Sequence, residues 1–247
     1  MKRRFGYSPA QVDEANPYWL SFSDLMSALL VIFLLAAVAL IIELSQTQKI
    51  IQQDIQALRN GDQARKDILY EVRDALKSKD ILVEVTDNDT VLRIPQGTLS
   101  FLSNRDEIPE DSEAAVIAIG EALHSAINKP FSQETNLMRF EYLDTVFIEG
   151  HTDSLHSPRV KGNWGLSAFR AISLWEYWEN NLQRKPSFES MKNAFGEKLF
   201  SVSGYAASRR VQTDERRPEQ REKNRRIDLR FTVKRPSIVE LEKIADQ

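Results

Sequence analysis

A carboxylate, Asp24, stands at the edge of the most apolar stretch of the chain, where it could take part in ion transfer. The residues from Leu25 to Ile42 carry no charge. A carboxylate at the centre of a membrane helix costs about 2.5 to 3.5 kcal/mol, so an acid near such a position usually has a function. Asp24 and Ser27 fall on one helical face, which places a hydroxyl beside the carboxylate. We expect Asp24, supported by Ser27, to carry an ion; the alternative is an acid at the membrane boundary, wetted by lipid headgroups.

The stretch beside Asp24 is long enough to cross a membrane. At 1.5 Å per residue, Leu25 to Ile42 covers about 27 Å, and Tyr18 and Trp19 extend it toward the edges of a hydrocarbon core about 30 Å thick. A signal peptide fits less well, because its apolar region has roughly 7 to 15 residues and ends at a cleavage site. The sequence therefore predicts a transmembrane helix over residues 17–43.

Basic residues predict the orientation of this helix. Lys2, Arg3 and Arg4 precede it, whereas Lys49 is the only basic residue among the 15 that follow it. Since cytoplasmic flanks carry an excess of Lys and Arg, residues 1–16 are predicted to form a cytoplasmic segment. We then expect the helix to cross the cytoplasmic membrane once, with the rest of the chain outside that membrane, in the periplasm if the source is a Gram-negative bacterium.

The polar stretch after the membrane helix predicts a helical connector over residues 44–80. Apolar residues recur in it at three- and four-residue spacing, which is typical of a helix with one narrow apolar face. Gly61 interrupts this pattern, so we expect two helices, Glu43 to Asn60 and Asp62 to Lys77. Their apolar stripe either pairs with a second copy of the chain or belongs to a solvated stalk.

Alternating strand and helix patterns predict a folded domain over residues 81–235. The expected strands are ILVEV and TVLRI, joined in a hairpin by Asp87-Asn88-Asp89, then TVFIEG, LFSVSGY and RIDLRFTV. Expected helices run from about Pro109 to Ile127 and from about Leu166 to Leu182. The order β-β-α-β-α-β-β predicts an α+β two-layer sandwich with the helices on one face of the sheet. Residues 236–247 are predicted to be a C-terminal tail.

The composition argues against several other kinds of site. The chain has no cysteine, which excludes Cys-ligated metals and thiol catalysis. His151, Asp153 and His156 match no standard metal spacing, and no G-x-S-x-G nucleophile elbow is present. Residues 209–235 have a basic surplus, but acids are interleaved and the single aromatic residue is Phe231, unlike a nucleic-acid surface. We expect no enzyme, no metal, no cofactor and no direct nucleic-acid partner.

Three motifs in the predicted domain together resemble the OmpA-like peptidoglycan-binding domain, whose signature is G-x-T-D, then N-x-x-L-S-x-x-R-A, then N-R-R-[VI]. The first motif corresponds to Gly150-His151-Thr152-Asp153, which follows a predicted strand. The second is the run from Asn163 to Ala171 at the start of a predicted helix, and the third is Asn224-Arg225-Arg226-Ile227. The resemblance covers about residues 81–235 and implies an α+β OmpA-like fold.

The same resemblance implies a peptidoglycan ligand. Diaminopimelate in a peptide stem carries both an ammonium and a carboxylate, and Asp153 and Arg170 can supply the matching anion and rigid bidentate cation. The other binding residues that the resemblance implies are Thr152, Asn163, Leu166 and Arg226. The alternative is an internal Asp–Arg pair without a ligand.

Nearly the whole chain resembles the B subunit of MotA/MotB-type stator units. The shared features are the N-terminal membrane helix, its acid in the context W-x-x-x-x-D-x-M-S, the helical connector and the outer domain. The resemblance implies a homodimer inside a ring, implied to be a pentamer, of a multi-pass MotA- or ZorA-like membrane protein. Protonation and release at Asp24 would step this ring while the outer domains hold peptidoglycan, and the expected translocated ion is H⁺.

Within that group, the helix start W-L-S-F-S-D-L-M-S, the short connector and the loop insertions are more similar to ZorB subunits of Zorya anti-phage defence systems than to flagellar MotB subunits. This similarity implies a motor that acts in antiviral defence. Two alternatives remain open, namely a flagellar stator subunit and a passive peptidoglycan anchor without ion flux.

Overall fold

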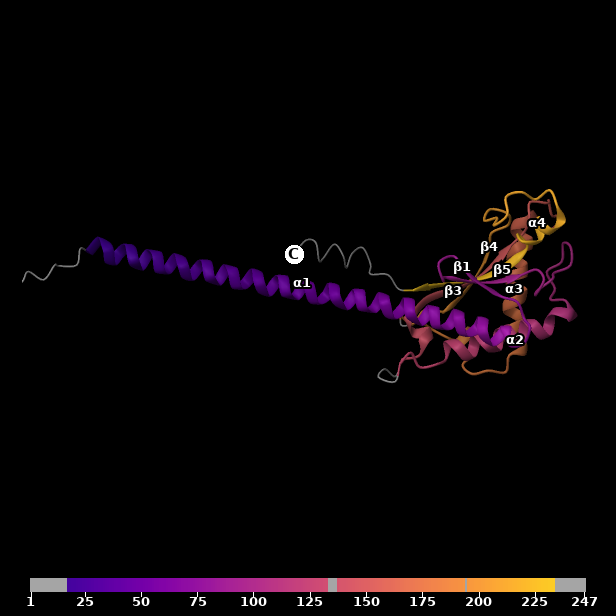
Figure 1. Ribbon diagram of the computed structural model, residues 1–247, viewed down its shortest axis with the longest axis horizontal. Coiled ribbons are helices and arrows are strands. Elements are labelled where there is room, and N and C mark those ends of the chain that lie inside the picture. Colours follow the sequence, from indigo (N-terminus) through magenta and orange to yellow (C-terminus); the bar gives the residue numbers. More distant parts are fainter. Residues whose placement is uncertain (1–16, 133–136, 194, 234–247) are drawn as a thin grey trace, which may run out of the picture. The chain divides into compact units, whose positions relative to one another are not determined.

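The computed structural model describes residues 17–132, 137–193 and 195–233 (Figure 1). The chain forms two compact units, one of Met1–Asp54 with Ser237–Gln247 and one of Ile55–Pro236. The second unit thus begins well before Ile81, where the sequence analysis places the start of the folded domain. The predicted cytoplasmic segment over residues 1–16 and the predicted tail over residues 236–247 lie outside the described residues.

Helix α1 is one continuous helix, Pro17–Lys77, and contributes residues to both units. In the first unit its large apolar side chains from Leu25 to Ile42 are exposed, and this part of the helix is long and apolar enough to cross a membrane. The prediction of two helices separated at Gly61 is wrong. One glycine costs a helix only about 1 kcal/mol, which tertiary packing readily offsets.

The packing around Gly61 explains why a glycine stands there. A Cβ atom at this position would lie 3.2 Å from Cβ of Val233 and 3.4 Å from the backbone oxygen of Tyr142. The residue is buried, so its missing side chain allows close approach of α1 to the sheet of the second unit. Gly61 therefore serves packing rather than a helix break.

The apolar stripe that follows Gly61 belongs to the core of the second unit. Ile68, Leu69 and Leu76 are fully buried, and Val72 is 1% exposed. Both alternatives of the sequence analysis, pairing with a second copy or a solvated stalk, are therefore wrong for this part of the helix. In contrast, Ile55 is 43% exposed.

The second unit contains a five-stranded sheet with the strand order β1-β2-β5-β3-β4. Strands β3 and β4 are parallel, and the other neighbours are antiparallel. The predicted hairpin is confirmed as β1 and β2, joined through Asp87, Asn88 and Asp89, which all have positive φ. The strand bounds are Glu84–Thr86, Val91–Pro95, Leu143–His151, Phe200–Gly204 and Arg226–Val233 for β1 to β5.

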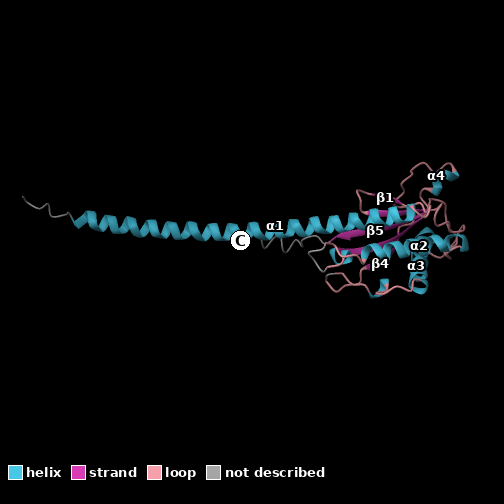
Figure 2. Cartoon of the chain, turned by 60° about the horizontal axis from the view of Figure 1, so that its bottom comes forward, coloured by secondary structure: helices cyan, strands magenta, loops and turns pink. Residues whose placement is uncertain are grey.

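Alternation along the strands places the core on one face of this sheet. Ile148 of β3 and Leu229 of β5 are fully buried in a hydrophobic cluster to which α1, α2 (Glu110–Ile127) and α3 (Gly162–Asn181) also contribute. The intervening residues, among them Glu149 and Asp228, point to the opposite face, because successive side chains of a strand alternate. The predicted α+β sandwich is thereby confirmed, and Figure 2 shows α2 and α3 beside the strands.

The start of one helix differs from the prediction, and several short elements were not predicted. Helix α3 begins four residues before the predicted start at Leu166. The segments expected to be loop insertions, residues 130–144 and 184–198, contain the 3₁₀ turns Arg139–Tyr142 and Phe188–Ser190, and helix α4 (Pro218–Glu222) precedes β5. Pro218 at the first position favours this short helix, but five residues give no periodic pattern to read.

Candidate functional site

The end of β3 and the first turns of α3 bring the predicted site residues together. Thr152 and Asp153 follow β3 directly, and Asn163, Leu166 and Arg170 lie on one face of α3 at positions i, i+3 and i+7. Sequence spacing alone places the α3 residues on a common face. The approach of that face to β3 depends on tertiary packing.

Two glycines allow this close approach. A Cβ atom at Gly150 would overlap the backbone oxygen of Ser167, and one at Gly204 would lie 2.5 Å from the backbone nitrogen of Ala168. Ser167 is fully buried, and its hydroxyl accepts a hydrogen bond from the backbone N–H of Ala206 at 3.0 Å. The start of α3 is therefore held directly against β3 and the end of β4.

A cavity of about 400 Å³ lies at this junction. Five of the residues that the sequence analysis assigned to ligand binding line it, namely Thr152, Asp153, Asn163, Leu166 and Arg170. Further lining residues come from the loop after β2, the loop after β3 and the segment before β5; they are Gln96, Phe101, Ser103, Asn104, Leu155, His156 and Arg225. The wall thus combines one carboxylate, two guanidinium groups and several amide and hydroxyl groups.

Asp153 is the anion of this cavity and is 7% exposed. Its Oδ2 lies 2.6 Å from Nη1 of Arg225, and its Oδ1 accepts a hydrogen bond from the backbone N–H of Leu155 at 3.1 Å. The side-chain amide of Asn163 donates to the backbone oxygens of Asp153 and Leu155. Asn163 therefore fixes the loop that carries the carboxylate.

Arg170 is held in the cavity wall by backbone oxygens. Its Nε donates to the oxygen of Arg105 at 2.9 Å and its Nη2 to that of Leu102 at 3.1 Å, while the guanidinium lies 4.9 Å from the ring centre of Phe101. Burial, and then the nearby charge of Arg225, lowers the pKa of Arg170 to about 10. The group still carries its positive charge at neutral pH.

The third motif reaches the cavity through Arg225, which the sequence analysis did not assign to the site. Nε of Arg225 also donates to Oε1 of Gln96, so the side chain is held between two elements. Arg226 is not among the described residues that line the cavity; its Nε lies 2.9 Å from Oδ2 of Asp228. Two adjacent arginines in N-R-R diverge at the start of a strand, and the motif does not indicate which one faces the ligand.

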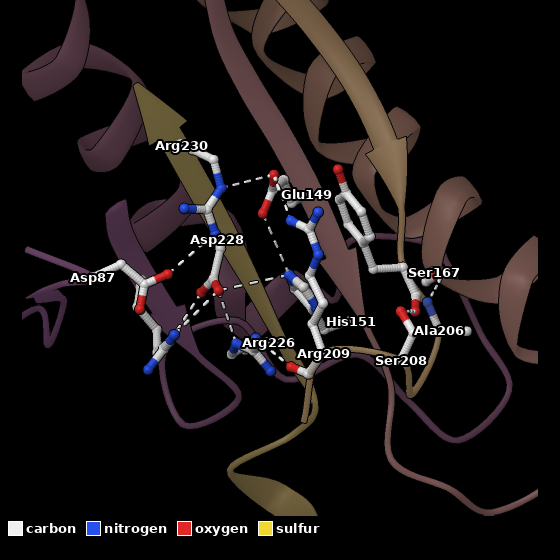
Figure 3. A network of polar contacts seen from close by, with 12 residues as sticks. Asp87, Glu149, His151, Ser167, Ala206, Ser208, Arg209, Arg226, Asp228 and Arg230 are labelled. Atoms are coloured by element: carbon white, nitrogen blue, oxygen red, sulfur yellow. Dashed lines mark hydrogen bonds and ion pairs between the residues drawn. The ribbon is translucent and has the colours of Figure 1, made fainter. Parts of the chain in front are cut away.

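Behind the cavity lies a polar network on the sheet face opposite the core (Figure 3). His151 is 1% exposed, and its Nε2 lies 3.8 Å from Oε2 of Glu149 and 3.6 Å from Oδ2 of Asp228. Within the described residues, neither ring nitrogen of His151 has a hydrogen-bond partner, and the same holds for Oε2 of Glu149. The sequence analysis placed His151 in a motif and set it aside as a metal ligand, but it did not predict this network.

Arginines neutralise both carboxylates of this network. Asp228 receives Nε and Nη2 of Arg93 at 3.0 and 3.2 Å in addition to Arg226. Glu149 lies 3.0 Å from Nε of Arg230 and 3.5 Å from Nη1 of Arg209. Burial acts to raise the pKa of each carboxyl, but the neighbouring cationic and donor groups outweigh it, so both pKa values lie below the usual range.

His151 itself is held in its neutral form. Burial is the largest cause of its lowered pKa, and Arg226 adds to the effect, against the opposing influence of the two carboxylates. The ring stacks on Tyr205 with centroids 5.5 Å apart, and the guanidinium of Arg209 lies 3.8 Å above the centre of the Tyr205 ring. Tyr205 thus contacts both the buried imidazole and the half-exposed Arg209.

In the first unit, Asp24 and Ser27 lie on the exposed surface of α1. The hydroxyl of Ser27 donates to the backbone oxygen of Ser23 at 2.7 Å, a common arrangement for serine inside a helix. The supporting role predicted for Ser27 therefore requires its hydroxyl to turn from the backbone toward the carboxylate.

Comparison with protein families shows what kind of domain carries this cavity. A family model described as the OmpA family matches residues 101–225, just over half of the chain. The chain belongs to the OmpA family. The matched range includes every described cavity residue except Gln96. Strands β1 and β2 and helix α1 precede the match, so part of the core of this OmpA-family domain lies outside it.

Several solved structures are similar to this chain at low sequence identity. A MotB-like protein from Desulfovibrio vulgaris is 16% identical with a TM-score of 0.52, over 71% of this chain and 98% of that one. The periplasmic domain of Helicobacter pylori MotB is 19% identical with a TM-score of 0.45, over 66% and 88%. The cell wall anchor of the T6SS from Pseudomonas aeruginosa is 18% identical with a TM-score of 0.45, over 69% and 99%. No curated protein matches the chain.

Proposed function

We propose that this OmpA-family protein is the wall-anchored stator subunit of an ion-driven rotary motor in the bacterial inner membrane. The observation that carries the proposal is the cavity that Asp153 and Arg170 both line. The membrane helix with Asp24 supplies the ion-carrying part. As the resemblance to ZorB subunits implies, the motor acts in anti-phage defence.

The cavity suits a ligand that carries an ammonium and a carboxylate on neighbouring atoms. Asp153 offers an anion, and Arg170 and Arg225 offer planar guanidinium groups that can hold a carboxylate through two parallel hydrogen bonds. Diaminopimelate in the stem peptide of peptidoglycan has this pair of charges. Because both guanidinium groups are anchored by protein oxygens, little side-chain entropy is lost when the ligand binds.

The helix in the first unit suits a membrane-spanning ion carrier. Its apolar surface is exposed over a length that matches a bilayer, and Asp24 stands at one edge of that surface. One helix cannot enclose an ion path, so the site requires a partner. We propose two copies of this chain inside a ring of a multi-pass MotA- or ZorA-like protein, with H⁺ as the translocated ion.

The energetics are sufficient for such a motor. Moving one charge across a membrane potential of 100 mV releases about 2.3 kcal/mol, enough to bias one step of the ring strongly. The ring can rotate only if a fixed element resists the torque. Outer domains bound to the wall would be that fixed element. A passive wall anchor would need neither Asp24 nor a ring.

Sedimentation with purified sacculi tests the wall-binding part of the proposal. The full chain in detergent should pellet with sacculi, and Arg170→Ala and Asp153→Asn should each reduce the pelleted fraction at least about tenfold. Arg184→Ala removes an exposed guanidinium paired with Glu121 and should pellet like the wild type. Near-UV circular dichroism checks that each variant is folded. Folded Arg170→Ala and Asp153→Asn proteins that pellet normally would reject the anchor.

Substitution of the membrane acid tests the motor. Asp24→Asn should insert into the membrane and co-purify with the ring-forming partner, yet abolish phage protection. Asp54→Asn changes another carboxylate of the same helix beyond the apolar stretch and should retain protection. Protection that survives Asp24→Asn contradicts the motor. Restored swimming in a strain without its own stator would instead assign the chain to flagellar motility.

A further inference from the structure

We infer that His151 is a positioning residue for the proposed wall-binding cavity, and that protonation of its ring weakens wall binding in acid. The inference rests on the proposed function as a wall anchor. His151 is the last residue of β3, directly before Thr152 and Asp153 of the cavity. It also lines a narrow hollow adjoining the cavity, together with Arg170 and Arg225.

The surroundings of the ring fit a neutral imidazole. Its Nε2 lies 3.8 Å from a carboxylate oxygen of Glu149 and 3.6 Å from one of Asp228, distances too long for hydrogen bonds. Tyr205 covers one ring face. A protonated imidazole would have two charged N–H groups in this buried site, whereas no described residue accepts a hydrogen bond from either nitrogen.

The charge balance around the ring disfavours a further positive charge. Cationic groups surround the His151 ring from several elements. They are Arg93 of β2, Arg226 and Arg230 of β5, Arg209 of the segment after β4, and Arg170 and Arg225, which line the adjoining hollow. Four of these guanidinium groups pair with the carboxylates of Glu149 and Asp228, and Arg230 pairs with Asp87 as well.

The same balance argues against a divalent metal ion. The donor atoms of Glu149, His151 and Asp228 lie within 4.8 Å of one another, which is close enough for a shared ion. However, an added charge of +2 would face the paired arginines at short range in a poorly solvated site. A proton is therefore the smaller perturbation, because it adds one charge where a divalent metal ion adds two.

One oxygen atom links the ring to the cavity. Oδ2 of Asp228, the atom 3.6 Å from His151, is also the atom that accepts from Nε of Arg226 at 2.9 Å. A protonated His151 would compete with Arg226 for this oxygen and repel its guanidinium. Arg226 is paired in register with His151 in the sheet and is bonded covalently to Arg225, the partner of Asp153.

The expected direction follows from this chain of contacts. Displacement of Arg226 in acid shifts Arg225 away from Asp153 and disorders the pair that faces the ligand. Wall binding should then weaken about three- to tenfold between pH 7.5 and pH 5.0, which lies within the limit of tenfold per pH unit that a single proton can produce.

The test uses the full chain and its small number of histidines. Only three are present, His124, His151 and His156, so single His→Gln variants assign the three ring signals in an NMR titration. Sacculus affinity is measured at pH 7.5 and 5.0 for the wild type, His151→Gln and His156→Gln. For each protein, the affinity at pH 7.5 is divided by its own affinity at pH 5.0, and these ratios are compared between the proteins. His156 also lines the cavity, so His156→Gln is the matched control.

We expect His151→Gln to abolish the pH dependence and His156→Gln to retain it. In the wild type, the backbone amide signals of Asp153 and Arg225 should shift with the midpoint of the His151 ring. This second measurement decides the question if His151→Gln does not fold. A ratio near one in the wild type, a pH dependence lost only in His156→Gln, or amide signals that ignore the His151 titration each overturn the inference.

Two further outcomes distinguish the proton-linked role of His151 from a metal site and from a failure of the wall-binding function. Zinc binding that His151→Gln abolishes would assign the cluster to a metal and overturn the proton-linked role. Wild-type protein that fails to pellet at pH 7.5 would reject the wall-binding function itself, whereas normal pelleting at both pH values would reject only the role of His151.

Discussion

Arg225 and Asp153 form an ion pair of 2.6 Å between Nη1 and Oδ2, although 72 residues separate them in the sequence. The pair joins the loop after β3 to the residue before β5 and forms part of the cavity wall. A bound ammonium must share Asp153 with Arg225. A ligand that also carries a carboxylate offers Arg225 a new partner at the same time.

Removal of this pair should destabilise the second unit. Arg225→Ala leaves the nearly buried Asp153 without its charged partner, and we expect the free energy of unfolding to fall by about 1 to 3 kcal/mol. Denaturant unfolding followed by tryptophan fluorescence measures the change, and a double-mutant cycle with Asp153→Ala isolates the pair energy. Arg216→Ala breaks an exposed pair with Asp214 and should cost less than about 0.5 kcal/mol. Equal costs for Arg225→Ala and Arg216→Ala would contradict the prediction.

A methyl group at Gly150 should separate α3 from β3. Its Cβ would overlap the backbone oxygen of Ser167, and backbone atoms cannot move aside as a flexible side chain can. Gly150→Ala is expected to cost at least about 3 kcal/mol and to reduce sacculus binding. Gly97→Ala is the matched control, because no atom lies within 4 Å of its added Cβ. Thermal unfolding compares the two variants, and a Gly150→Ala protein as stable as Gly97→Ala would show that this contact is not needed.

The second half of α1 should be essential to the second unit. Leu69→Ala removes a fully buried side chain from the core and should lower the free energy of unfolding by about 2 to 5 kcal/mol. Ile55→Ala acts on a side chain that is 43% exposed and should cost less than about 1 kcal/mol. Denaturant unfolding of both variants tests this difference. A small effect of Leu69→Ala would favour a domain that begins near Ile81.

Stability of the second unit should fall in two steps as the pH is lowered. The pKa values of His151, Glu149 and Asp228 all lie below their usual values in the folded chain. The unfolded chain therefore takes up protons first, so each group contributes stability above its unfolded pKa that is lost as the pH falls through its folded pKa. The first step begins below about pH 6.5 for His151, and the second below about pH 4.5 for the carboxyls.

His151→Gln should remove the first step and leave the second. Denaturant unfolding at intervals between pH 7.5 and pH 3 measures both. His124 is also buried, but its Nε2 lies 2.9 Å from the backbone oxygen of Pro186, outside the polar network. His124→Gln is therefore the control that should retain the first step. A first step that persists in His151→Gln would assign it to another group.

Local patterns were sufficient for much of the fold and for part of the site. The hairpin over β1 and β2, the helices α2 and α3 and the last strand follow from turn residues and apolar periodicity, which act between near neighbours in the sequence. The face of α3 that carries Asn163, Leu166 and Arg170 also follows from helical spacing. The apolar stretch after Asp24 predicts a membrane helix from its length alone.

Contacts between distant segments could not be inferred in the same way. The stripe from Ile68 to Leu76 reads equally well as a stalk, a dimer seam or a core helix, because periodicity shows that a face is apolar but not what covers it. Gly61 likewise looks like a break, since the sequence does not reveal that Val233 lies against it.

The sequence by itself determined that this protein has an apolar helix, an α+β domain and three motifs able to form one site. Only the tertiary structure decided that Arg225 rather than Arg226 faces Asp153, and that His151 lies between two carboxylates behind the cavity. The physical reason is that spacing along the chain fixes which side chains share a face. The burial, partners and protonation of those side chains depend on segments that meet only when the sheet is assembled.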